Sequence, residues 1–298
     1  MERVCVILVN YNGKAYNDKC IESILKSTIE KYLQIVVIDN NSKDGSLELL
    51  RKNWSKNEKI HIISLTENYG FSKANNIGIK WALEKGYEYI LLLNNDTEID
   101  AQAIERMIAL QKETKAVIVP KILYADKPDS IWYAGGDFSH YIKKSKHIGL
   151  NDKDCIRYGS NYRCLFANGC CVLLSRKIID EIGMLDERFF LYYEDTEYSM
   201  RINKMKKEIW YCGKAVIYHK VNGSTKGNNN PSNVYYISRN WLICNRLYMK
   251  NRFYLFLLYY IMNRMCWAMI WMAQGKKELV VAMIKGIRDY QRGKTGKE

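Results

Sequence analysis

The chain has 298 residues, of which 48% are hydrophobic and 26% are charged, and this composition excludes an intrinsically disordered protein. Its formal net charge of +14, from 46 basic and 32 acidic residues, favours an anionic partner: nucleic acid, a membrane surface or a phosphorylated substrate. The nine cysteines form no CxxC pair and no zinc-type spacing with histidine, which favours reduced thiols in a cytosolic compartment over a disulfide framework.

The first hundred residues alternate between short apolar runs and segments with helical spacing. Residues 4–9 form an apolar run that is too short for a signal peptide and is predicted to be a strand covered on both faces. Further strands are predicted at 34–38, 60–65 and 89–93, with helices between them, the last over 71–85. This alternation predicts an α/β fold with a mostly parallel sheet flanked by helices.

The middle of the chain is less regular. Residues 116–120 are predicted to form a strand that Pro120 stops. Residues 131–136 and 168–174 are also apolar, and we expect them to join or extend the same sheet.

Polar residues follow four of the predicted strands: Asn10-Tyr11-Asn12, Asp39, Asn68-Tyr69-Gly70 and Asp96. Because the carboxyl ends of parallel strands meet at one edge of a sheet, these residues are expected to share a ligand-binding rim. The Asp96 carboxylate can hold a divalent cation such as Mg²⁺, which takes one or two carboxylates plus substrate phosphates. The alternative is a strand-ending turn, which Asn and Asp also favour.

Some of these residues suit a nucleotide. Asp39 can accept hydrogen bonds from a base or from ribose hydroxyls. Gly70 and Gly78 permit close backbone approach, and Asn75 lies on the helix between them. The glycines do not form the GxGxxG fingerprint, which disfavours a nicotinamide site.

Two further groups of residues could take part in catalysis or ligand binding. Glu194, Asp195 and Glu197 follow an aromatic block, and a carboxylate beside aromatic surface and a second carboxylate should have a raised pKa, as a general base needs. The alternative is an acidic first helical turn that complements the helix dipole. His219 follows an apolar stretch and is either a ligand or a polar surface residue.

An ordered set of motifs resembles the family 2 glycosyltransferases of the GT-A fold, notably their rhamnosyltransferase-like branch, over roughly residues 1–240. The motifs are Val9-Asn10-Tyr11-Asn12, Val37 to Ser42, Glu67 to Gly78, Leu93 to Asp96, Asn168-Gly169, and Glu194-Asp195 through Arg201.

The resemblance implies an inverting hexosyltransferase that uses a nucleotide diphosphate sugar. Asp195 would be the catalytic base, with Glu194 and Glu197 as runners-up, and Asp96 and His219 would hold Mg²⁺ or Mn²⁺ on the diphosphate. Asn94 stands where the family's DXD-type motif begins with Asp, a departure that weakens metal binding at that position. The implied donor-binding residues are Asn10, Tyr11, Asn12, Asp39, Asn68, Gly70, Asn75 and Asp96.

The same resemblance implies a substrate class. The donor would be dTDP-rhamnose or a UDP-sugar, and the acceptor a hydroxyl of a glycan or lipid-linked precursor of surface polysaccharide. Residues 1–226 would be the catalytic domain, with a nucleotide-sugar half (1–100) and an acceptor half (101–226). The alternative is a catalytically impaired relative that only binds sugar nucleotides, since Asn94 departs from the motif. A sugar-nucleotide pyrophosphorylase would need a glycine-rich, basic loop after the first strand, which is lacking.

A breaker run at 227–232 separates a C-terminal segment, residues 227–298, that is predicted to be helical, basic and aromatic. Residues 253–273 are long enough to span a bilayer, but Arg264 opposes insertion, so an in-plane helix on the cytoplasmic face of the cell membrane is expected. Arg252 and Arg264 would reach lipid phosphates. Packing of the helix on the catalytic domain is the alternative. The apolar character of this segment disfavours a nucleic-acid groove.

Overall fold

The computed structural model describes residues 3–139, 142, 144–220 and 230–298. The strands are β1 (Val4–Asn10), β2 (Leu33–Asp39), β3 (Ile60–Ser64), β4 (Tyr89–Asn94), β5 (Thr97–Ile99), β6 (Val117–Tyr124), β7 (Lys127–Ala134), β8 (Gly136–Phe138), β9 (Ser145–His147), β10 (Tyr162–Cys164), β11 (Cys171–Ser175) and β12 (Ile209–His219). The α-helices are α1 (Asn17–Leu25), α2 (Ser46–Trp54), α3 (Gly70–Glu84), α4 (Ala103–Thr114), α5 (Arg176–Ile182), α6 (Glu194–Lys204), α7 (Pro231–Met249), α8 (Phe253–Ala273) and α9 (Lys277–Gln291). Short 3₁₀ turns are η1 (Glu30–Tyr32), η2 (Ile156–Gly159) and η3 (Lys250–Arg252).

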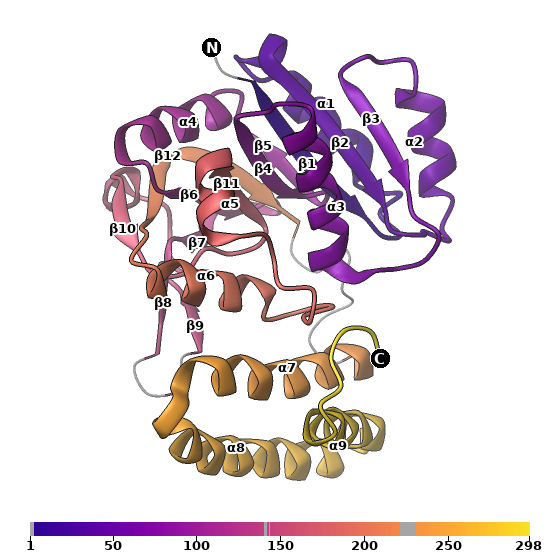
Figure 1. Ribbon diagram of the computed structural model, residues 1–298, viewed down its shortest axis with the longest axis vertical. Coiled ribbons are helices and arrows are strands. Elements are labelled where there is room, and N and C mark those ends of the chain that lie inside the picture. The colour runs from indigo at the N-terminus through magenta and orange to yellow at the C-terminus, as the bar shows by residue number, and fades with distance from the viewer. Residues whose placement is uncertain (1–2, 140–141, 143, 221–229) are drawn as a thin grey trace.

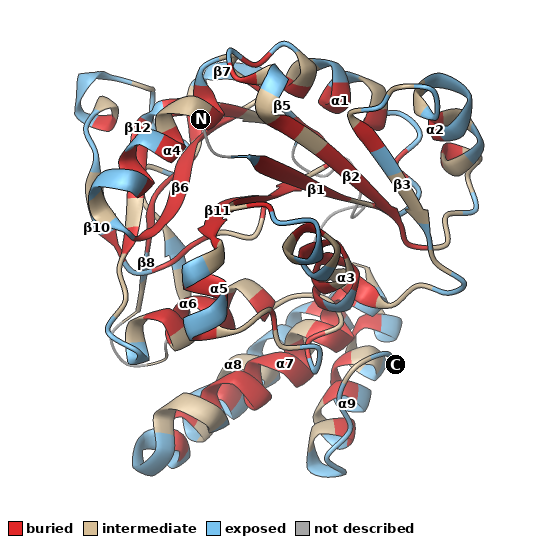
Figure 2. Ribbon diagram, turned by 45° about the horizontal axis from the view of Figure 1, so that its top comes forward, coloured by how far each residue is buried: buried red, intermediate tan, exposed pale blue. Residues whose placement is uncertain are grey.

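The N-terminal half of the sheet is parallel, as predicted. β1 pairs in parallel with both β2 and β4, and β2 pairs in parallel with β3. The residues Val4 to Leu8 are completely buried, because α1 and α2 cover one face of these strands and α3 covers the other (Figure 2). Gly78 of α3 has no room for a side chain, since a Cβ there would lie 2.6 Å from Ile7, so helix and sheet pack closely.

The second half of the sheet is mixed. β11 lies antiparallel between β4 and β6, and β12 runs parallel to β6, so the order is β10-β12-β6-β11-β4-β1-β2-β3. The runs 131–136 and 168–174 form β7 and most of β11, which join the sheet as expected, whereas Gly136 begins β8, which pairs with β9 in a separate two-stranded sheet. β5, which the sequence does not signal, pairs antiparallel with the end of β12.

The prediction that Pro120 stops its strand is wrong. β6 continues through Pro120 to Tyr124. The partner β12 has a register shift between Cys212, which faces Pro120, and Val216, which faces Lys121. This irregularity allows a residue without an N–H to sit inside the ladder.

The three C-terminal helices form a separate layer beyond α3 and α6 (Figure 1). Helix α7 begins at Pro231, where the Asn230 side chain accepts a hydrogen bond from the Ser232 N–H. Most of the predicted breaker run lies outside the described residues. Lys250, with φ of 39°, ends α7, and α8 folds back beneath it (Figure 1). The predicted helix over 253–273 matches α8.

Helix α8 is mostly uncovered. Only Phe253, Phe256, Tyr260 and Trp271 are buried, while most of its other apolar side chains are exposed. The two polar residues inside the helix point the other way. Arg264 reaches Ser238 of α7 at 3.3 Å, and the Oδ1 atom of Asn263 is buried. The Arg264 side chain therefore lies on the α7 side of the helix, with its guanidinium 5.1 Å from the Trp241 ring centroid, so the expectation that it reaches phosphates of a bilayer surface on the outer side of α8 is wrong for this conformation.

Candidate active site

The ends of β1, β2, β3 and β4 meet at one edge of the sheet, as predicted. Asn10 lies opposite Asp39, Asp39 lies opposite Ser64, and Val9 lies opposite Asn94. The polar residues that end these strands are therefore neighbours across the ladder, although the turns that carry them are far apart in sequence.

Asn10 connects the strand ends inside the protein. Its side chain is fully buried, and its Nδ2 donates to the Asp39 Oδ1 at 2.7 Å. Its Oδ1 accepts hydrogen bonds from the Gly13 N–H and from the side-chain amides of Asn17 and Asn95. The sequence predicts that Asn10 contacts a ligand, but these bonds occupy its side chain, so its observed role is to orient Asp39.

Asp39 is held at both oxygens. Besides the bond to Asn10, its Oδ2 accepts the Ser42 N–H at 3.2 Å, and the side chain is 1% exposed. The two residues that follow Asn10, Tyr11 and Asn12, are both exposed, and Asn12 has φ of 55°. Those two residues thus form the accessible part of this corner, while Asp39 itself is buried.

The turn before α3 is tied to a distant loop. Asn40 donates to the Asn68 Oδ1 at 2.9 Å and to the Gly70 carbonyl at 3.2 Å. Gly70 has φ of 79°, and a Cβ on it would lie 2.3 Å from the Phe190 carbonyl, so only glycine fits. Asn75 is buried and donates to the Phe71 carbonyl, which makes it a structural residue in this state.

Asp96 and His219 are brought together. The antiparallel pairing of β5 with β12 sets His219 opposite Thr97, and the His219 Nε2 lies 3.3 Å from the Asp96 Oδ1. Burial lowers the pKa of His219, but the adjacent Cys170 and Asp96 groups raise it by more, to about 10. Burial also raises the pKa of the Cys170 thiol.

The segment Gly169-Cys170 links this pair to the second acidic cluster. The Asn94 N–H donates to the Cys170 carbonyl at 2.8 Å, and the Gly169 N–H donates to the Asp195 Oδ2 at 3.3 Å. This short segment therefore contacts both the strand end that leads to Asp96 and the Asp195 carboxylate. The sequence did not predict this connection between the Asp96–His219 pair and the second acidic cluster, although the Asn168-Gly169 motif marks its position.

Burial raises the pKa of Asp195, although hydrogen bonds from the Gly169 and Thr196 N–H groups partly oppose this. Burial and the Asp195 charge also raise the pKa of Glu194, whose Oε2 is buried without a hydrogen-bond partner among the described residues. Asp195 is partly accessible, whereas Glu194 is 8% exposed. Of the two, Asp195 is better placed to take a proton from a bound molecule.

Glu197 has structural partners. Its carboxylate accepts two hydrogen bonds from Arg201, at 2.8 and 3.1 Å, and a third from the Tyr248 hydroxyl at 2.6 Å. These contacts join α6 to α7. Because both carboxylate oxygens of Glu197 accept hydrogen bonds, the interpretation of this residue as a structural contact fits and its interpretation as a general base does not.

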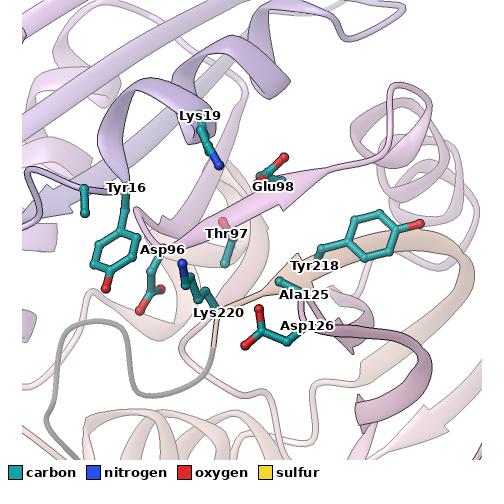
Figure 3. Close-up of a pocket in the computed structure, with 10 residues that line it drawn as sticks. Tyr16, Lys19, Asp96, Thr97, Glu98, Ala125, Asp126, Tyr218 and Lys220 are labelled. Carbon is teal, nitrogen blue, oxygen red and sulfur yellow. The ribbon is translucent and has the colours of Figure 1, made fainter.

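Asp96 lines a hollow of about 210 Å³ (Figure 3). Tyr16 and Lys19, at the start of α1, border this hollow. Asp126 and Lys220, just after the ends of β6 and β12, border it as well. Sequence reasoning missed these four residues; the position of Asp126 and Lys220 just beyond strand ends is the signal that could have found them. The described residues contain no group of three or more His, Cys, Asp or Glu side chains suited to a metal.

The sequence matches the family model "Glycosyl transferase family 2" over residues 5–183. It is 28% identical over 222 residues to a low-salt glycan biosynthesis hexosyltransferase of Haloferax volcanii, covering 71% of this chain and 65% of that one. It is also 28% identical over 199 residues to the dTDP-rhamnosyl transferase RfbF of Shigella flexneri, covering 66% of this chain and 62% of that one. The chain thus spans less than two thirds of either relative.

Two solved structures share the fold. A crystal structure of GalNAc-T7 with UDP, GalNAc and Mn²⁺ aligns with a TM-score of 0.62 and 20% identity, over 80% of this chain and 48% of that one. Residues 1–349 of TarS from S. aureus align with a TM-score of 0.54 and 18% identity, over 81% and 65%. At these identities the likeness supports the predicted GT-A architecture alone.

Proposed function

The chain belongs to glycosyl transferase family 2, and we propose that it is an inverting hexosyltransferase that moves a sugar from a nucleotide diphosphate sugar to a glycan or lipid-linked hydroxyl. The observation that carries the proposal is the contact of Gly169-Cys170 with both Asn94, two residues before Asp96, and the Asp195 carboxylate. Such a transfer needs one charged group at the leaving diphosphate and one base at the attacking hydroxyl.

The residues at the sheet edge take separate roles in this reaction. Asp39, oriented by Asn10, accepts hydrogen bonds from the base or ribose of the donor. Tyr11 and Asn12 lie exposed beside it and contact the same nucleotide. Asp195 accepts the proton of the acceptor hydroxyl as the new bond forms, and Asn68, Gly70 and Asn75 shape the donor pocket through the backbone they hold.

Asp96 and His219 fit a divalent cation, Mg²⁺ or Mn²⁺. One carboxylate and one imidazole without a third acidic ligand match an ion that completes its shell with water and substrate phosphates. The ion would neutralise the charge that develops on the departing diphosphate. A metal ion binds a neutral imidazole, so ligation of the ion by His219 would require any proton on the binding nitrogen to be released.

A panel of UDP-, dTDP- and GDP-sugars tests the function. The purified protein is incubated with each donor and Mg²⁺ or Mn²⁺, and slow hydrolysis of the donor is measured together with protection against thermal unfolding. We expect one donor both to stabilise the protein and to be hydrolysed; dTDP-rhamnose is the first to try because of the likeness to RfbF. Binding without hydrolysis or transfer would identify the protein instead as a binding-only relative.

The C-terminal helices support a place at the membrane, where a lipid-linked acceptor resides. The helical segment Pro231–Ala273 is long and apolar enough to cross a bilayer by length and composition, but it is folded into α7 and α8. Helix α7 is buried against the catalytic domain, so the available apolar surface is the outer side of α8. We place α8 in the plane of the cytoplasmic leaflet, with residues 227–298 as the membrane-binding part.

A further inference from the structure

The three C-terminal helices enclose a groove. Helices α8 and α9 both pack on α7, and the groove between them has a volume of about 610 Å³. Its walls are mainly apolar, with Phe253 and Tyr260 from α8 and Met283 and Ile287 from α9. A volume of this size lies within the range of small-molecule sites, about 300–1,000 Å³.

Two arginines line this apolar groove. The Arg246 guanidinium lies 5.0 Å from the Phe253 ring centroid, and that of Arg264 lies 5.4 Å from the Tyr260 ring centroid. Among the described residues neither arginine forms an ion pair, and the Arg264 Nε is buried without a hydrogen-bond partner. Arg246 is exposed where it lines the groove and Arg264 is half-buried, and two positive charges beside an apolar wall match an amphiphile with a negatively charged end.

The groove is continuous with the surface that we place against the membrane. Tyr254, Ile261 and Met265 line its mouth and are also exposed on α8. The aromatic cluster that supplies Phe253 and Tyr260 to the groove also packs against Tyr193, the residue before Glu194. The groove therefore shares part of its wall with a cluster that contacts the loop carrying the candidate base.

We propose that this groove binds a membrane lipid in which a phosphate is attached to one hydrocarbon chain. The phosphate oxygens accept hydrogen bonds from Arg246 and Arg264, and the chain lies along Phe253, Tyr260 and Ile287. The identification of this lipid as the carrier of the sugar acceptor rests on the proposed function; the binding of the lipid phosphate does not.

Isothermal titration calorimetry on the full-length protein tests the groove with three probes: farnesyl phosphate, farnesol and inorganic phosphate. We expect farnesyl phosphate to bind at least about 10-fold more tightly than either of the others, because only it satisfies the arginines and the apolar wall together. Equal affinity for farnesol would overturn the phosphate contact. Equal affinity for inorganic phosphate would show a free-anion site and overturn the lipid assignment.

Substitutions locate the binding. Arg246→Gln should raise the dissociation constant of farnesyl phosphate by about 10- to 100-fold, the effect of losing a charge-assisted hydrogen bond. The matched control is Arg252→Gln, an exposed arginine at the start of α8 that does not line the groove. Ala268→Trp fills the groove and should weaken farnesyl phosphate and farnesol alike, in a variant whose thermal unfolding remains cooperative.

Two outcomes overturn the proposal outright. One is unchanged farnesyl phosphate affinity in both Arg246→Gln and Arg264→Lys, and the other is an equal loss in Arg252→Gln. Donor hydrolysis is measured in the same variants and should be unchanged. Failure of hydrolysis in the wild-type protein counts against the proposed function, whereas failure of lipid-phosphate binding counts against the groove.

Discussion

Asp195 is one of two adjacent carboxyl groups with raised pKa values, and its surroundings distinguish it from Glu194. The Gly169 and Thr196 N–H groups fix its oxygens, while it stays partly accessible. Asp195→Asn should therefore lower the turnover number by about 10² to 10⁴, the usual contribution of a general base. Affinity for the nucleoside diphosphate, measured by calorimetry, should change by less than about twofold. Wild-type turnover in this variant would transfer the role to Glu194.

Glu194 should destabilise the folded protein at neutral pH. Its pKa is raised by burial and by Asp195, so as pH rises above the ordinary glutamate range the unfolded chain loses this proton before the folded one does. Stability falls by about 1.4 kcal/mol for each pH unit over which only the unfolded state is ionised. Glu194→Gln should remove most of this decline between pH 5 and pH 8 in urea denaturation. An identical pH slope in the two proteins would contradict the assignment.

Asp96 is the carboxylate we assign to the metal. In Asp96→Ala, affinity for the nucleoside diphosphate should fall at least about 10-fold with Mg²⁺ or Mn²⁺ present, and should match the wild type in EDTA. Glu98→Ala is the control, since Glu98 is an exposed carboxylate that lines the same hollow. Wild-type activity that is untouched by EDTA would refute the metal assignment, and Asn94 would be the first residue to examine.

At the scale of elements, helix α7 holds the loop that precedes the acidic pair. Tyr192 and Tyr193 have φ of 65° and 74°, a left-handed conformation that is unfavourable for bulky residues. The fully buried Asn240 of α7 donates to the Leu191 carbonyl at 2.9 Å and the Tyr192 carbonyl at 3.0 Å. Arg239 donates to the Asn240 Oδ1 and so fixes which way the amide faces. Asn240 is thus a positioning residue for Glu194 and Asp195.

Asn240→Ala should lower the turnover number by about 10- to 100-fold with the KM for donor unchanged, because it misplaces the base without touching the nucleotide site. Asn245→Ala is the matched control: Asn245 is equally buried on the same helix, but among the described residues its amide donates to the Trp241 carbonyl alone. Both variants should lose comparable stability in thermal unfolding. A similar fall in turnover for Asn245→Ala would mean that general destabilisation explains the effect.

The elements that sequence predicted best are those whose signal is local. The apolar runs of β1, β2 and β4 and the polar residues after them identified the sheet edge, because strand burial and strand ending are both visible in a few residues. The pairing of β5 with β12 joins residues over one hundred positions apart and has no local signal. The nearness of His219 to Asp96 was therefore implied only by resemblance to a family.

The burial of particular charged and polar side chains is the second feature that the sequence did not predict. Arg239 belongs to the basic tail by composition, yet it is completely buried, bonded to the Gly296 carbonyl and to Tyr235. Charge alone predicts a surface residue. Likewise, Leu279 and Met283 of α9 belong to the basic C-terminal segment by composition, yet they are buried together with Val234 and Trp271.

At the scale of the whole molecule, the proposed contact with a membrane rests on the outer side of α8. Its exposed residues include Leu255, Leu258 and Met262, and its only charged residue, Arg264, faces α7. Arg264 therefore opposes a membrane-spanning orientation of α8, but it does not oppose a helix that lies in the membrane interface. At about 1.5 Å per residue, the 21 residues of α8 offer an apolar strip about 30 Å long.

Positive charge surrounds this strip. From Arg239 onward the chain has twelve basic residues against three acidic ones, and Lys250, Arg252 and Lys277 are exposed at the two ends of α8. Each basic residue near an anionic surface contributes on the order of 1 kcal/mol, and this contribution is screened over a Debye length of about 10 Å at 0.1 M salt. Apolar contact is not screened, so the two contributions separate in a salt titration.

Binding of the full-length protein to anionic vesicles, measured by sedimentation, should therefore weaken as salt rises and level off at an apolar remainder that detergent removes. Leu255→Glu with Leu258→Glu should abolish that remainder, because two charges would enter the interface on the outer side of α8. Ile156→Glu is the control, since Ile156 is 96% exposed on η2, which lies outside the three C-terminal helices. If the wild-type protein does not bind anionic vesicles at low salt, or if the α8 double variant binds as it does, then the outer face of α8 is covered by something other than a membrane.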